Sequence, residues 1–169
     1  QEFSECQALL GLHFIFGVPL SALLMMVTKQ TVWAIENSAT NHIFSVIKTY
    51  CAYFTVGYLL LAFAAFRYQE FLNEFLNVSG DMTLQAFILS FYIGTLMSLF
   101  LAIIQGQKRF GLLSIFLFLS AFSKLIFAII FLEFQSSSES VFWSFCASNF
   151  MLAVIAVWKI WPMLDIKQA

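Results

Sequence analysis

Residues 105–131, QGQKRFGLLSIFLFLSAFSKLIFAIIF, decide how this chain folds. They join a short basic segment, residues 105–109, to an apolar run long enough to cross about 30 Å of hydrocarbon as a helix of roughly 20 residues. One charge, Lys124, interrupts that run. A charge at membrane depth costs at least about 2.5 kcal/mol, so it needs a compensating environment and usually serves a function. The stretch therefore predicts a transmembrane helix that carries a single cation.

Composition extends this prediction to the whole chain. Hydrophobic residues make up 62% of the 169 residues, charged residues make up 10%, and the mean hydropathy is +0.90. Soluble domains are typically about 45–50% apolar and about 25% charged. We therefore expect an integral membrane protein whose first partner is the lipid bilayer. The net charge of −1 provides no basic field, so we expect no nucleic-acid partner.

Five runs have the length and the apolar character of membrane spans: 7–27, 43–66, 84–105, 111–133 and 141–161. The strands of a membrane barrel would alternate polar and apolar residues, whereas these runs are continuously apolar. The predicted fold class is therefore all-α, a polytopic transmembrane helix bundle of five spans that forms a single domain over residues 1–169. Short connections join the spans at 28–42, 67–83, 105–110 and 135–140, and a tail follows at 162–169.

The distribution of Lys and Arg predicts the orientation of the bundle. Five successive spans put the connections 28–42 and 105–110 and the C-terminal tail on one side. Arg67 lies on the other side, and Lys124 lies inside a span. The remaining basic residues share the first side: Lys29, Lys48, Lys108, Arg109, Lys159 and Lys167. We expect that side to be cytoplasmic, with the N-terminus of this chain outside and its C-terminus inside.

The segment after the second span has two open interpretations. Apolar and polar residues separate at helical spacing in it, Phe71, Leu72, Phe75 and Leu76 against Glu70, Asn73, Glu74 and Asn77. It is either a short amphipathic helix on the outer interface or a helical extension of the second span.

Small residues predict where the spans pack, because helices in lipid associate through close approach. The third span has such a face at steps of four, Ser90, Gly94, Ser98, Ala102 and Gly106. In the first span Gly17 and Ser21 share a face with His13, and Pro19 predicts a kink. In the fourth span Lys124 shares a face with Ser114, Leu117, Ala121 and Ala128. We therefore expect Lys124 to point toward protein rather than lipid.

Three polar residues inside the spans are candidate substrate-binding residues. Lys124 either lines a polar cavity and meets an anionic group, or snorkels outward, roughly 20 Å along its helix. The small-residue face favours the cavity. A hydrogen-bonded packing role for His13 is favoured over proton coupling or substrate contact. Asn149, near the middle of the last span, more often serves as a polar contact between helices than as a ligand.

Nothing in the spans predicts catalysis. Membrane-embedded hydrolases and transferases need clustered acid–base or metal-binding groups, and no carboxylate lies in the predicted hydrocarbon zone. The cysteines Cys6, Cys51 and Cys146 lack zinc or disulfide spacing. We expect a protein that is not an enzyme and that binds no cofactor and no metal.

The basic turn and the helix after it resemble a known family. Gln105, Gly106, Arg109 and Phe110 form a Q-G-x-x-R-F turn, and the next helix carries Lys124 near its middle. Earlier, the segment PLSA at 19–22 is followed by Lys29, and the opening QEFS at 1–4 is similar to L-G-P-x-E-[FY]-G with Ser in place of Gly. Together these motifs resemble the oligosaccharide and polysaccharide flippases of the MATE-like (multidrug/oligosaccharide-lipid/polysaccharide exporter) superfamily.

The resemblance runs through the chain in order and implies helices two to six of a transporter with twelve or more, in its N-terminal lobe. It implies a bacterial inner-membrane flippase for lipid-linked oligosaccharide or polysaccharide precursor, partnered by the remaining helices of the same transporter. Two bundles would rock around a central basic cavity, where Lys124 would contact the pyrophosphate or acidic sugars of the substrate. The first helix and the second bundle are missing from this sequence, so this piece alone would not alternate access.

Two other functions stay open at this point. A drug/cation antiporter of the same superfamily would be expected to carry intramembrane carboxylates. A small five-helix scaffold protein, complete as it stands, is the alternative from a different class.

Overall fold

The computed structural model describes residues 2–37, 39–76, 81–134 and 137–164. Those residues form six α-helices and no strand: α1 (Glu2–Glu36), α2 (Thr40–Arg67), α3 (Gln69–Leu76), α4 (Asp81–Gly106), α5 (Phe110–Phe134) and α6 (Ser138–Leu164). Five of them, all but α3, are long and apolar enough to cross a membrane. The predicted all-α bundle with five spans is confirmed.

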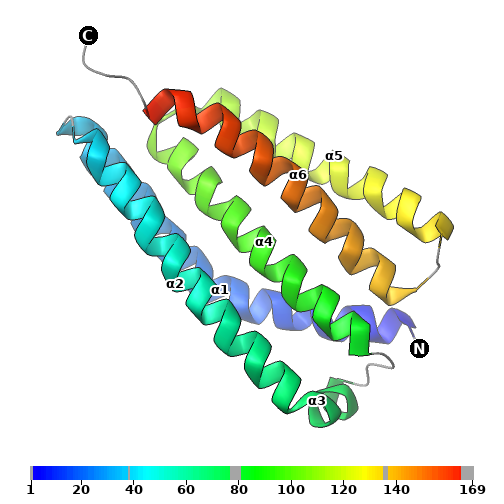
Figure 1. Cartoon of the computed structure of the whole chain (residues 1–169). Helices are drawn as coiled ribbons and strands as arrows, with labels where there is room; N and C mark the ends of the chain where they lie inside the picture. The colour runs from blue at the N-terminus through cyan, green and yellow to red at the C-terminus, as the bar shows by residue number, and fades with distance from the viewer. Residues whose placement is uncertain (1, 38, 77–80, 135–136, 165–169) are drawn as a thin grey trace.

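Helix α4 is the centre of the bundle. Figure 1 shows α5 and α6 together on one side of it and α1 and α2 together on the other, and α4 contacts all four. Half of the most apolar segment of α4 is buried, against 6% in α1 and in α2. The outer helices therefore leave most of their apolar surface exposed, as expected where the surroundings are lipid or further helices.

The core has two layers along the bundle. The layer at the end where α4 meets α5 includes Val27, Val46, Ile103, Phe116 and Leu152. The layer at the opposite end is built around Leu9, Ala65, Phe87 and Phe142. Each layer takes residues from α1, α2, α4 and α6, so the helices run the whole length of the bundle side by side.

Helix α1 is longer than predicted. The connection expected at 28–42 is mostly helical, and only residues 37–39 separate α1 from α2. Val27, Thr31 and Ala34 recur at helical spacing and are fully buried, so packing extends the helix past the purely apolar run. Figure 1 shows α1 bent, and Pro19 lies inside it, as a proline-induced kink requires.

The other ends differ less from prediction. Helix α6 continues to Leu164, beyond the predicted end at 161, so the expected tail begins as helix. Residues 165–169, which include Lys167, lie outside the described residues, as do 77–80 and 135–136.

Helix α3 settles the two interpretations of residues 67–77. Tyr68 has left the helical conformation and separates α3 from α2, so the extension of the second span is wrong. The four apolar residues do not all share one environment, however. Leu76 is buried against the bundle, whereas Phe71 and Phe75 are exposed and stack on each other with ring centroids 6.0 Å apart. Asn77 lies outside the described residues.

Candidate functional site

The small-residue face of α4 brings α1 close at one end of the bundle. A Cβ added at Gly106 would lie 2.6 Å from the Cβ of Thr31 and 3.0 Å from the carbonyl oxygen of Thr28. The Thr28 hydroxyl also donates a hydrogen bond to the carbonyl of Ala102, at 3.2 Å. The glycine of the Q-G-x-x-R-F turn therefore serves close helix packing, since only a residue without a side chain allows the two backbones to come this near.

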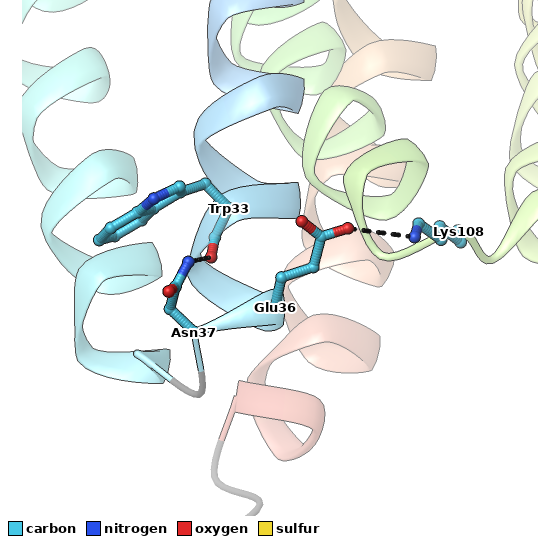
Figure 2. Close-up of polar contacts among 4 residues, drawn as sticks. All are labelled: Trp33, Glu36, Asn37 and Lys108. Carbon is cyan, nitrogen blue, oxygen red and sulfur yellow. Dashed lines mark hydrogen bonds and ion pairs between the residues drawn. The ribbon is translucent and has the colours of Figure 1, made fainter.

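The turn after Gly106 is short and attached to the end of α1. Lys108 has a φ of 57°, in the left-handed region that L residues rarely adopt. Its ammonium lies 3.4 Å from Oε1 of Glu36, and the Asn37 side-chain amide donates a hydrogen bond to the Trp33 carbonyl at 2.8 Å. Figure 2 shows both contacts. Arg109 and Phe110 are exposed beyond the turn. The close packing at Gly106 and the ion pair of Lys108 place residues 105–110 at a corner where α4 turns into α5 beside the end of α1.

Lys124 is half-buried in the middle of α5. Its ammonium lies 5.9 Å from the ring centroid of Phe145 on α6, within the range of a cation–π contact. Ser148 of α6 lies level with Lys124, because it bonds to the neighbouring Ser123. Phe145 lies one turn closer to the start of α6, so the lysine side chain points toward the start of α6. Within the described part of the chain, Lys124 forms no ion pair with a carboxylate.

His13 faces the same region from α1. Its ring meets Phe91 of α4 edge to face, with centroids 5.4 Å apart and an interplanar angle of 86°. The contacts of His13 with Phe14 and Phe91 are thus aromatic, whereas a hydrogen-bonded packing role was expected.

Asn149 is buried between α6 and α4. Its Nδ2 would lie 3.2 Å from a Cβ added at Gly94, so the amide occupies the space that the glycine leaves open. Beside it, the hydroxyls of Ser148 and Ser123 form a buried hydrogen bond of 2.6 Å between α6 and α5. The predicted interhelical role of Asn149 agrees with this position. The serine pair was not predicted, although both serines stand in otherwise apolar runs next to predicted residues.

The structure therefore gathers the three candidate residues in one band around α4. Ser123 and Lys124 are neighbours on α5, Ser148 and Asn149 are neighbours on α6, and Phe91 and Gly94 are one turn apart on α4. A chain of ring contacts crosses this band from the Lys124 ammonium to His13, through Phe145, Phe142, Phe87 and Phe91.

A groove with a volume of about 640 Å³ lies between α1 and α5, with α4 as its floor. Ser21, Ser98 and Gln105 contribute polar atoms to its wall, and Lys29 stands at its basic end. Gln105 is thus the residue of the turn motif that faces this groove, while Gly106 packs beneath α1.

The predicted packing face of α5 needs correction. Ser114, Leu117 and Ala121 are exposed, and Leu117 lines the groove instead of contacting another helix closely. The buried residues of α5 are Phe116 and Ser123, because the large ring and the serine pair fill the contact with α6. Lys124 therefore sits at the border between the packed face and the open face.

Comparisons with protein families, with characterised proteins and with solved structures gave no match to this chain.

Proposed function

We propose that this chain is part of a membrane transporter that moves lipid-linked oligosaccharide or polysaccharide precursor across the bacterial inner membrane, as a flippase of the MATE-like superfamily. The five apolar helices supply the membrane-spanning scaffold that such a transporter requires. The motif turn 105–110, which carries the resemblance, is an ordered corner whose glycine and glutamine have separate structural tasks. In this proposal the chain is not an enzyme and uses no cofactor.

The observation that carries the proposal is the half-buried Lys124 with no described carboxylate beside it. A fixed cation among apolar helices is costly unless water or an anion balances it. A substrate with a pyrophosphate or acidic sugars would supply that anion each time it enters.

In this proposal the substrate enters through the groove between α1 and α5, whose wall on α5 is formed by Leu113 and Leu117, and moves on from there toward Lys124. The floor of this groove is the well-packed α4, and its walls are the loosely covered α1 and α5. In the proposed mechanism, this bundle forms one lobe, and the remaining helices of the transporter form the other lobe across the cavity. Rocking of the two lobes would expose the band around Lys124 to each side in turn, with the basic end of the bundle in the cytoplasm.

Lys124→Ala tests this function. Export should fall strongly, because the substrate anion loses its counter-charge, while folding should be nearly unchanged since no fixed carboxylate is left unpaired. Lys124→Arg should keep part of the activity, because the charge remains and the geometry changes. The measurement is restoration of surface polysaccharide in a flippase-deficient strain by the full-length protein.

Lys159→Ala is the matched control, since it removes an exposed lysine of the bundle away from the band. Membrane levels of every variant are compared by immunoblot. If Lys124→Ala restores as much polysaccharide as the wild type at an equal protein level, the proposal is wrong. Lys124 would then only extend its ammonium to the membrane surface.

A further inference from the structure

Two cavities between α1 and α2 join into one groove. The first lies near the connection 37–39 and has a volume of about 380 Å³. The second lies deeper in the bundle, against α4, and has a volume of about 230 Å³. Leu23 and Tyr53 line both. We call the combined feature the α1–α2 groove; it lies on the other side of α1 from the groove between α1 and α5.

The polarity of this groove changes along its length. Gln30, His42, Ser45 and Thr49 line the outer part, at the basic end of the bundle. The deeper part is lined almost entirely by apolar and aromatic surface, with Phe16, Leu20 and Phe91 among its walls. The hydroxyl of Tyr92 is satisfied by Thr55 at 2.9 Å, so this tyrosine presents its ring to the cavity.

The fold keeps the deep part open at two places. Pro19 lines it from inside α1, and a proline within a helix bends it. Gly57 faces it from α2, and a Cβ added there would meet nothing within 4 Å. Gly57 is therefore not a packing glycine like Gly106, since no neighbouring helix occupies the space beside it.

We propose that the α1–α2 groove binds a membrane phospholipid from the leaflet at the basic end of the bundle. The phosphate headgroup lies at Gln30, His42 and Ser45, which offer hydrogen-bond donors at the mouth. One acyl chain enters the aromatic part between Pro19 and Gly57. This lipid is a structural or regulatory ligand, and the inference does not depend on the transport function.

Charge at the mouth favours an anionic headgroup. Lys48 follows Ser45 by three residues on α2, and Lys29, which lines the groove between α1 and α5, lies at the same end of the bundle. Both lysines are exposed. Basic residues near the membrane surface attract anionic lipids.

Other occupants fit the groove less well. Water is a poor filling for the deep part, because apolar cavities stay dry. A further helix is about 10–12 Å in diameter, too wide for a seam between two helices that contact each other. A hydrocarbon chain is thin, is abundant at this depth and gains dispersion contacts with the aromatic wall.

The test measures phospholipid retained by the full-length protein purified in mild detergent, by native mass spectrometry and by lipid extraction. Phosphatidylglycerol and phosphatidylcholine are supplied in equal amounts. The wild type should retain phosphatidylglycerol preferentially. Gly57→Leu should lower retained phospholipid roughly tenfold, because its side chain takes the place of the acyl chain. Leu23→Trp fills the junction of the two cavities and should have the same effect. This second variant carries the test if Gly57→Leu folds poorly.

Ala52→Leu is the matched control, because Ala52 is an exposed small residue of α2 that lines neither cavity. It should retain phospholipid as the wild type does. Ser45→Asp should remove the preference for phosphatidylglycerol by adding a negative charge at the mouth. Unchanged retention in both cavity-filling variants would overturn the proposal. So would a wild type without bound phospholipid, or one that retains polyisoprenyl phosphate in its place.

Discussion

Gly106 and Gly94 belong to the same row of small residues on α4, yet they make different contacts. Gly106 faces the branched Cβ of Thr31 and the backbone of Thr28, both fixed parts of α1. Gly94 faces the end of the Asn149 side chain, 3.2 Å from the added Cβ position. A repeated sequence pattern thus produces one rigid contact between backbones and one adjustable contact with a side chain.

This difference distinguishes the α1–α4 contact from the α4–α6 contact. The α1–α4 contact near Gly106 holds the motif turn and is built from atoms that cannot move independently. The α4–α6 contact near Gly94 borders the band around Lys124, where polar side chains fill the space. A region that must fit a changing ligand gains from contacts that side-chain rotation can adjust, and the following substitutions test that distinction.

Gly106→Ala should have the largest effect. The new methyl group would overlap Thr31 and the Thr28 carbonyl, so α1 and α4 must separate, at a cost of about 3 kcal/mol in the free energy of unfolding. Reversible unfolding in mixed micelles measures it. Gly11→Ala is the control, because Gly11 has nothing within 4 Å of its added Cβ. Equal stability of both variants would show that the close approach at Gly106 is not rigid.

Ser148→Ala should have the next largest effect. It removes the hydrogen bond between α5 and α6 from a fully buried position, and such bonds average about 0.6 kcal/mol in membrane proteins, with a maximum near 1.7. The same unfolding assay applies. Ser114→Ala is the control, since this exposed serine bonds within its own helix. A loss well above the maximum would mean that the serine pair orders the whole band.

Gly94→Ala should change stability by less than about 1 kcal/mol, because alanine favours helix and Asn149 can shift its amide. This is the same substitution as at Gly106, so the pair of values measures the comparison directly. A double variant with Asn149→Ala should show no further loss at Gly94. If Gly94→Ala instead destabilises the protein as much as Gly106→Ala, Asn149 is held rigidly and the proposed contrast is wrong.

Glu36→Gln should have the smallest effect. Glu36 and Lys108 are 61% and 68% exposed and 3.4 Å apart, and exposed ion pairs contribute about 0–1 kcal/mol. The variant and the wild type should therefore have nearly equal free energies of unfolding, both at low salt and at high salt. If Glu36→Gln clearly lowers the free energy of unfolding, and by less at high salt, then the ion pair contributes part of the rigidity that we attribute to Gly106.

The number and class of the five long apolar helices followed from the sequence because hydrocarbon thickness sets the length of an apolar span, whereas the existence of α3 as a separate helix stayed open. The extent of α1 did not follow from the sequence, since residues 28–36 are only partly apolar and Thr31 and Ala34 become buried only when α1 packs in the bundle. The split of Phe71 and Phe75 from Leu76 also depends on what α3 packs against.

The candidate residues were found because polar groups are rare in these helices, but their arrangement required the structure. Periodicity placed Ser114, Leu117 and Ala121 correctly on one face of α5 with Lys124. It could not say that large Phe116 would pack against α6 while the small residues stayed exposed. The Ser123–Ser148 bond was hidden for the same reason, because two helices must be docked before their serines can meet.

The central position of α4 also sets an order of events while the chain is being made. Chains fold from the N-terminal part as synthesis proceeds, and α1 and α2 are already in place when α4 leaves the ribosome. The rigid contact at Gly106 can therefore form at once, whereas the surface that carries Gly94 waits for α6. Until then α4 lies in the membrane with that flank uncovered, and Lys124 arrives on α5 before its aromatic neighbour on α6 exists. Of the six helices described, α6 is synthesised last and completes the band around the lysine, so in a nascent chain halted before α6 the Lys124 ammonium has not yet met Phe145.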